Sequence, residues 1–403
     1  FAGMVAWNLG AGPMGMLRGQ RPLVSQYLGA GDRKAAFEFG AHGFYLALAF
    51  AFLMLGLSPW SHAAMEWATG TTGITKQAGV LTGDYLQIRM EWTGPWLMTV
   101  AVGEYLRSVG RPRVAMVADL VCHPLNIFLS WCLIFGNLGF PEMGVRGAAL
   151  GTGIADLIAM LVMFQLSRPK GKLQIPKFRW ARMKRVLSTG ITGGVQFSLE
   201  SISYGIITYF VARLGTVPLA VHQIGITLIH LAMMPCIAVA DGASVLVGQY
   251  TGDKQWKAVR RTVRSGFQIM LPFAGLMALV YWLGGEFLVG IFVPLDDPNY
   301  HESITLGAGL LIAAAIWQIG DVFQFSYRFS LRATGDHKWV MWVGILVSWI
   351  LSVPLAWWVV EIMHGSVIHV WMAWNAETYF GSWLFYRRWK SGKWKEKRLV
   401  HDE

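Results

Sequence analysis

The chain has 403 residues, of which 54% are hydrophobic and 14% are charged, and its mean hydropathy is +0.44. Because a soluble domain carries about 25% charged residues, this composition excludes a soluble globular protein and predicts a polytopic membrane protein. The net charge of +11 would suit a nucleic-acid binder. Here, however, the lysines and arginines lie mainly in short connections between apolar segments, so we expect membrane lipids and no nucleic acid as partners.

Apolar segments long enough to span a membrane follow one another along the whole chain. A spanning helix needs about 20 mostly apolar residues. Eleven segments meet this requirement, at residues 1–27, 36–60, 78–108, 113–135, 145–167, 184–213, 216–249, 260–292, 303–332, 338–360 and 366–388. Every second connection is rich in Lys and Arg, and the others are acidic or nearly neutral. The positive-inside rule therefore places the basic connections in the cytoplasm, and we expect residues 61–73 to form an outer interfacial loop.

Two short motifs occur twice, at nearly the same separation. Leu23–Gly29 (LVSQYLG) returns as Leu246–Gly252 (LVGQYTG), and Leu106–Gly110 (LRSVG) returns as Leu331–Gly335 (LRATG). Each copy lies at the end of an apolar segment, which indicates a duplicated membrane unit. Parallel repeats of this size are typical of secondary transporters, which bind substrate and ions between the two halves.

The repeat predicts an all-α membrane protein built from two six-helix bundles. We expect an N-terminal lobe at residues 1–167, a cytoplasmic linker at 168–182, a C-terminal lobe at 183–390 and a basic cytoplasmic tail at 391–403. In the repeat, Phe1 aligns with about Ile224, well inside the second half. We therefore expect one further spanning helix before Phe1, which gives twelve helices with both termini of the full-length protein in the cytoplasm.

Glu200 and Asp321 lie midway along predicted spanning segments, where an acid costs about 2.5–3.5 kcal/mol on insertion scales and so needs a partner or a function. Each acid has polar or aromatic residues one helical turn before and after it. These are Gln196 and Tyr204 for Glu200, and Gln318 and Gln324 for Asp321. An acid flanked by amides is expected of a desolvated cation site, because carboxylate oxygens bind Na⁺ or a proton and neutral amides complete the shell. The plainer alternative is a buried acid that is hydrogen-bonded to a neighbouring helix. The sequence leaves open whether Arg18, Asp119, Asp156 and Asp241 face a central cleft.

Motifs of enzymes and ATPases are absent from the sequence. It contains no HExxH, GxSxG, Walker A or CxxC pattern. We therefore expect a transporter rather than an enzyme, with no cofactor, and with an ion gradient as the energy source.

The motifs resemble those of the multidrug and toxic compound extrusion (MATE) family, most closely its bacterial NorM-type branch. The resemblance rests on these stretches: Leu23–Asp32, Leu106–Met116, Asn126, Gly144–Ala149, His222-Gln223, Leu246–Gly252, and Gln318-x-x-Asp321-x-x-Gln324 leading to Leu331-Arg332. It implies that Glu200 and Asp321 bind the coupling Na⁺ or H⁺. It further implies that the substrate contacts Gln196, Tyr204, Trp317, Gln318, Gln324 and Asn126.

The sequence departs from the family at several places. Relatives often have Tyr where this chain has Trp317, which keeps an aromatic face but loses the hydroxyl. Asn126 is followed one turn later by Ser130, where relatives have Asp or Asn. Arg18 and Arg21 are unusual in their helix.

The sequence thus predicts a monomeric antiporter of the bacterial inner membrane that exports organic cations in exchange for Na⁺ or H⁺ by alternating access. Two alternatives remain at this stage. A flippase or exporter of lipid-linked or polyanionic substrates would need a basic central cleft, for which Arg18 and Arg21 are the visible hint. A membrane-embedded lipid-modifying enzyme would need a nucleophile–base pair or a metal cluster, and the sequence suggests neither.

Overall fold

The computed structural model describes residues 2–72, 75–167 and 176–400, and every regular element in these ranges is helical. The chain forms two compact units. Unit 1 comprises Phe1–Leu28 and Asp32–Val195, and unit 2 comprises Gly29–Gly31 and Gln196–Glu403. The division falls inside a long helix. The predicted linker stays a prediction, since residues 168–175 lie outside the described ranges and a helix already begins at Trp180.

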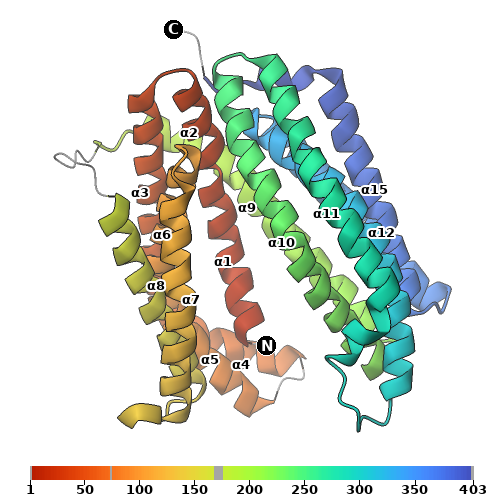
Figure 1. Cartoon of the computed structure of the whole chain (residues 1–403). Helices are drawn as coiled ribbons and strands as arrows, with labels where there is room; N and C mark the ends of the chain where they lie inside the picture. Colours follow the sequence, from red (N-terminus) through yellow and green to blue (C-terminus); the bar gives the residue numbers. More distant parts are fainter. Residues whose placement is uncertain (1, 73–74, 168–175, 401–403) are drawn as a thin grey trace. The chain divides into compact units, whose positions relative to one another are not determined.

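Unit 1 contains eight α-helices and the first half of a ninth within the described residues. They are α1 (Ala2–Arg18), α2 (Gln20–Gly29), α3 (Arg33–Leu57), α4 (Ser61–Thr72), α5 (Lys76–Glu91), α6 (Thr93–Ser108), α7 (Pro112–Phe135), α8 (Val145–Ser167) and α9 (Trp180–Ala212), with short 3₁₀ turns η1 (Ser58–Trp60) and η2 (Asn137–Gly139). Helices α7 and α8 pack side by side, as do α3 and α6 (Figure 1).

Two predicted spanning segments of unit 1 are broken into two helices each. The segment at 1–27 breaks at Gly19, where an added Cβ would lie 2.3 Å from the Cα of Gly190. The glycine thus lets α1 approach α9 more closely than any side chain would allow. The segment at 78–108 breaks at Trp92, and Pro95 follows in the first turn of α6, where its missing N–H costs nothing.

The expectation of an interfacial loop at residues 61–73 is wrong for its described part, because residues 61–72 form the helix α4. The stretch Ala63–Ala68 (AAMEWA) contains several good helix formers. Polar residues at its ends had suggested a loop.

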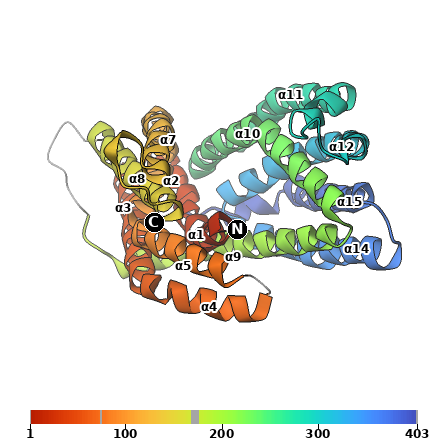
Figure 2. The same cartoon turned by 90° about the horizontal axis from the view of Figure 1, so that it is seen from below.

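Unit 2 contains the second half of α9 and six further α-helices among the described residues. These are α10 (Thr216–Gly252), α11 (Trp256–Gly290), α12 (Tyr300–Ala333), α13 (His337–Val347), α14 (Val353–Trp357) and α15 (Val367–Ser391), with π-helical turns η3 (Ser348–Ser352) and η4 (Trp358–Ile362) and a 3₁₀ turn η5 (Lys393–Lys397). Helix α12 packs against α10, α11 and α15 (Figures 1 and 2), so its side chains point into the interior of the unit on several sides.

Seven helical stretches in the described ranges are long and apolar enough to cross a membrane. The other four of the eleven predicted segments are also helical, but two are interrupted, at Gly19 and at Trp92, and two correspond to the more polar helices α9 and α15. The all-α polytopic architecture is therefore present.

Candidate functional site

Two contacts between α9 and α12 fix how these helices face each other in unit 2. Arg328 donates a hydrogen bond to Glu200 Oε2 over 2.5 Å. Arg332, one turn further along α12, donates to Gln196, which lies one turn earlier on α9. Because the residue numbers run in opposite directions, the helices are antiparallel, and the amide and acid predicted from the sequence both face α12.

Helix α15 runs parallel to α12 on another side. Asn375 donates to the carbonyl oxygen of Ala313 over 2.9 Å, and Ser382 donates to that of Gly320 over 3.0 Å. Between these two contacts lies Glu377, a half-buried acid that the sequence analysis did not select. Helices α9, α12 and α15 thus each contribute one carboxylate to the same part of unit 2.

Asp321 is the most deeply buried of the three acids, with 2% of its surface exposed. Glu200, Glu377 and Arg328 are the charged groups that act on it electrostatically. Its Oδ2 atom is buried and has no hydrogen-bond partner among the described residues. A buried polar atom without a partner costs about 1–3 kcal/mol, so this oxygen is available to a proton or a cation.

Gln318 adds further unused hydrogen-bonding groups beside Asp321. It is fully buried, and neither its Oε1 nor its Nε2 atom has a partner among the described residues. The indole N–H of Trp317 is also buried without a described partner. Trp317 and Gln318 are consecutive residues of α12 and lie within one turn of Asp321. Buried polar atoms without a described partner are therefore concentrated in this turn of the helix.

Glu200, in contrast, has both carboxylate oxygens engaged. Gln196 donates to Oε1 over 2.7 Å, and Arg328 holds Oε2. Side-chain exposure is 24% for Glu200 and 14% for Arg328, so the ion pair is partly shielded. An added Cβ on Gly344 of α13 would lie 2.1 Å from Gln196 Nε2 and 2.6 Å from Glu200 Oε1, so only glycine fits against this pair.

The turn that follows α13 closes the same region. Ser348 donates a hydrogen bond to Ser203 over 2.8 Å, and Trp349 donates to the carbonyl oxygen of Leu199 over 3.2 Å. At its other end Ser352 donates to Glu377 Oε2 over 3.3 Å. These contacts come from the π-helical turn η3, and such turns occur frequently at functional sites.

Aromatic rings lie next to the acids. The ring of Trp374 on α15 lies 6.0 Å from that of Tyr204 on α9 and 5.8 Å from that of Trp317 on α12. We call Tyr204, Trp317 and Trp374 the aromatic cluster. The side chain of Trp374 also forms a hydrogen bond with the carboxylate of Glu377. The cluster therefore joins the three helices that carry the acids.

The remaining predicted site residues divide between the units. Gln324 lies on the side of α12 that faces Gly381 of α15. Asn126 lies on α7 in unit 1, and its buried Nδ2 atom has no described partner. His222 is fully buried and accepts a hydrogen bond from Trp371 over 3.0 Å.

Arg328, Glu377 and Trp374 were missed by the sequence analysis, although signals for two of them exist. Arg328 is seven residues after Asp321 and so lies on the same helix face. Glu377 is an acid midway along the predicted segment 366–388, which is the criterion that selected Glu200 and Asp321. The position of Trp374 against Tyr204 and Trp317 depends on how three helices pack, and no feature of the sequence indicated it.

A group of three or more His, Cys, Asp or Glu side chains arranged to hold a metal ion does not occur in the described ranges. A cation at Asp321 would therefore draw on neutral oxygens, such as the free Oε1 of Gln318, besides the carboxylate. Such hard oxygen donors suit a hydrated ion better than a transition metal.

Unit 1 has its own buried charges. Glu104, which is 1% exposed, pairs with Arg21 at 2.6 Å and with Arg107 at 3.2 Å. Arg89 pairs with Asp156 on α8 at 3.3 Å, so this acid of a spanning helix has a cationic partner.

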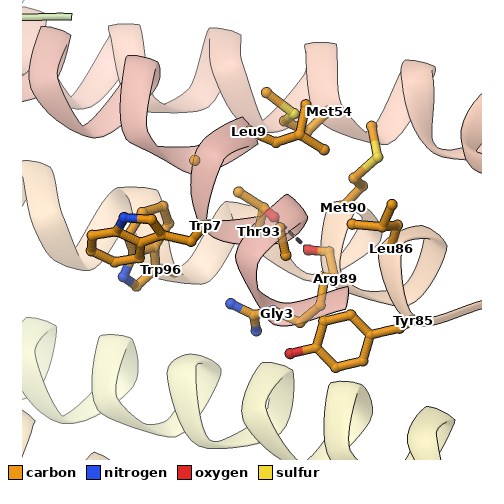
Figure 3. A pocket seen from close by; sticks show the side chains of 12 residues that line it. Gly3, Trp7, Leu9, Met54, Tyr85, Leu86, Arg89, Met90, Thr93 and Trp96 are labelled. Atoms are coloured by element: carbon orange, nitrogen blue, oxygen red, sulfur yellow. Dashed lines mark hydrogen bonds between the residues drawn. The ribbon is translucent and has the colours of Figure 1, made fainter. Parts of the chain in front are cut away.

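A pocket of about 170 Å³ lies in unit 1 beside Arg89 (Figure 3). Trp7, Tyr85 and Trp96 contribute aromatic side chains to its lining. Leu331 follows Leu106 by 225 residues, and by this separation Trp96 corresponds to Asp321. At this position unit 1 thus has an aromatic ring instead of an acid.

The family model described as MatE matches residues 1–132 and 194–358. The chain belongs to the MATE family of membrane transporters. This membership confirms the resemblance noted from the motifs and makes the protein a multi-pass membrane transporter rather than a lipid-modifying enzyme.

Relatives and solved structures agree with this assignment. A probable multidrug resistance protein NorM of Thermotoga maritima is 26% identical over 381 residues, covering 94% of this chain and 80% of the relative. A protein of the same description from Chromobacterium violaceum is 30% identical over 355 residues, covering 85% and 73%. The structure of an outward-facing multidrug resistance MATE family transporter superimposes with a TM-score of 0.86 at 16% identity, over 98% of this chain and 87% of that one. A MATE structure in complex with MaL6 gives a TM-score of 0.85 at 16% identity, over 98% and 89%. The all-α MATE fold is therefore confirmed.

Proposed function

We propose that this transporter exports organic cations across the bacterial inner membrane in exchange for Na⁺ or H⁺. The observation that carries the proposal is Asp321, which lies buried in a spanning helix with an unpartnered carboxylate oxygen and with Glu200 in electrostatic reach. The NorM names of the relatives support export of drug-like compounds. The basic connections and both termini of the full-length protein lie in the cytoplasm, and the transporter works as a monomer without a cofactor.

Charge balance supplies the exchange mechanism. Three carboxylates, Glu200, Asp321 and Glu377, stand against two guanidinium groups, Arg328 and Arg332. When all five side chains are ionised, they carry one net negative charge. One monovalent cation balances it, so binding of an organic cation favours loss of the coupling ion, and the reverse.

The chemical gradient of the coupling ion supplies the driving force. One-for-one exchange of monovalent cations moves no net charge across the membrane, so the membrane potential does not contribute. Since about 1.4 kcal/mol corresponds to a factor of ten in concentration, each tenfold gradient of Na⁺ or H⁺ sustains about tenfold accumulation of the organic cation. Alternating access through rocking of the two lobes exposes the acids to each side in turn.

Export of a polyanionic or lipid-linked substrate is the second candidate, and it depends on the arginines of unit 1. Arg21 pairs with the buried carboxylate of Glu104 at 2.6 Å, and Arg18 and Arg107 also act on this acid. The acids Glu200, Asp321 and Glu377 of unit 2 favour a cationic substrate instead.

Transport by the full-length protein in vesicles with imposed Na⁺ or pH gradients tests the proposal. We expect Glu200→Gln and Asp321→Asn each to abolish gradient-driven efflux of a cationic dye while expression and folding stay intact. Glu286→Gln on the exposed face of α11 and Asp296→Asn in a connection make the same chemical changes at exposed acids and serve as controls. Normal pumping by both site variants would show that the site is assigned wrongly.

A further inference from the structure

Glu377 differs from the other two acids in what its carboxylate can still bind. Both oxygens of Glu200 are engaged by Gln196 and Arg328. Asp321 is almost fully enclosed and is suited to a small ion. Glu377 is half-buried, and its side chain contacts Ser352 at 3.3 Å and Trp374, both neutral groups. Arg328 acts on it electrostatically but forms its ion pair with Glu200. Among the described residues, no cationic side chain is thus ion-paired with Glu377.

Glu377 lies beside the aromatic cluster. Trp374, one turn before it on α15, has its ring 6.0 Å from Tyr204 and 5.8 Å from Trp317. Aromatic faces attract positive charge, and Trp does so most strongly among the side chains. A carboxylate and several π faces together recognise a planar aromatic ring that carries a positive charge.

Unsatisfied polar groups at the same place point independently to a ligand. The indole N–H of Trp317, which belongs to the aromatic cluster, is buried without a described partner. The next residue, Gln318, is 0% exposed with both amide atoms unpartnered among the described residues. Buried polar groups are normally satisfied, so these atoms are open to water or to polar atoms of a bound molecule.

We infer that Glu377 and the aromatic cluster form the recognition site for the organic cation, while Asp321 serves the coupling ion. This inference rests on the proposed function and assigns separate acids to its two cations. Glu200 acts as a positioning residue whose charge is held by Arg328. The two cations compete because the charged side chains around them leave a single net negative charge, and not because both need the same carboxylate. The favoured substrates are planar aromatic monocations.

Two probes of nearly equal shape separate the role of charge from the role of the rings. The 10-methylacridinium ion is a planar monocation, and acridine is its neutral counterpart at pH 7.5. We expect the purified full-length protein to bind the cation at least about tenfold more tightly than the neutral probe, because a charge pair in a partly desolvated site is worth at least that much. Binding is measured by titrating probe fluorescence.

Single substitutions test which side chains cause the preference for the cationic probe. Glu377→Gln is expected to remove the preference for 10-methylacridinium over acridine. Trp374→Leu keeps the charge of Glu377 and is expected to weaken both probes, and the cation somewhat more because its cation–π contact is lost, while a preference for the cation remains. Glu286→Gln, an equal change at an exposed acid, is expected to match the wild type. A purely structural role of Glu377 would lower both affinities together, so the ratio is the decisive quantity.

Several outcomes would overturn the inference. Wild-type preference in Glu377→Gln would exclude Glu377 as the counter-ion, and unchanged affinities in Trp374→Leu would exclude the aromatic cluster. If Glu377→Gln does not fold, the affinities of Trp374→Leu still test the aromatic cluster. Glu377→Asp, which keeps the negative charge, must then still bind 10-methylacridinium more tightly than acridine. If these binding tests contradict the inference but dye export still depends on Asp321, the proposed function is unaffected. Absence of organic-cation transport by the wild type would instead reject the proposed function itself.

Discussion

Arg328 on α12 donates a hydrogen bond to Glu200 on α9 over 2.5 Å. One of the two acids predicted to bind the coupling ion therefore already has a cationic partner within the same unit. This pairing is the reason why the proposal assigns the coupling ion to Asp321, and it leads to the first prediction.

Replacing Arg328 by Gln removes one positive charge beside Glu200 and Asp321. We expect Arg328→Gln to bind the coupling cation more tightly but to exchange it more slowly, because the site then carries two net negative charges. Thermal unfolding of Glu200→Gln, Arg328→Gln and the double variant should give a coupling energy of about 0.5–3 kcal/mol. Additive effects of the two single changes would contradict a stabilising pair.

Gly344 tests the close packing of α13 on this ion pair. An added Cβ would lie 2.1 Å from Gln196 Nε2, so Gly344→Ala must displace Gln196, Glu200 or α13. We expect a loss of about 1–3 kcal/mol in stability, typical of an overpacked site, and impaired ion-driven transport. Gly275→Ala on α11 is the matched control, since a Cβ there meets no atom within 4 Å. Equal behaviour of the two variants in thermal unfolding and transport would rule out this packing role.

Ion binding at Asp321 should change tryptophan fluorescence, because Trp317 lies one helical turn away. We expect a saturable change in emission on addition of NaCl relative to choline chloride, or on acidification without Na⁺, depending on the coupling ion. Asp321→Asn should abolish the response, and Trp317→Phe should reduce it. If the wild type responds to neither ion, Asp321 is not an ion site.

Glu104 tests the buried charges of unit 1. Its carboxylate is 1% exposed and pairs with Arg21 and Arg107. Glu104→Gln leaves two arginines facing a neutral group, and breaking a buried pair in this way costs about 3–5 kcal/mol. We expect a marked drop in thermal stability, partly restored by adding Arg21→Gln. Wild-type stability of the single variant would show that the arginines are solvated.

Much of the fold followed from local composition. The apolar segments predicted helices that the structure contains, but the breaks at Gly19 and Trp92 were missed. Gly19 allows close approach to Gly190, which lies far away in the chain and could not be inferred from the segment itself. The helix at residues 61–72 was missed because polar ends outweighed its helix-forming centre.

The candidate site was predictable only in part. Glu200 and Asp321 stood out because an acid in a spanning segment is costly wherever it faces, and Glu377 met the same criterion without being selected. This criterion could not predict which side chain forms a hydrogen bond or an ion pair with each acid. Arg328 lies on α12 and Glu200 on α9, and no spacing within either segment indicates that the two meet.

The sequence by itself determined that the chain crosses a membrane repeatedly, that its two halves repeat, and that two acids lie in spanning helices. These properties depend on the transfer free energy of residues along one helix, which the order of amino acids specifies directly. Only the tertiary structure decided that Glu200 is held by Arg328, that Asp321 Oδ2 has no partner in the part of the chain that the structure describes, and that Glu377 lies beside Trp374. The reason is physical: the charge available at such a site is the balance over several packed helices, and that balance depends on which helix faces come together.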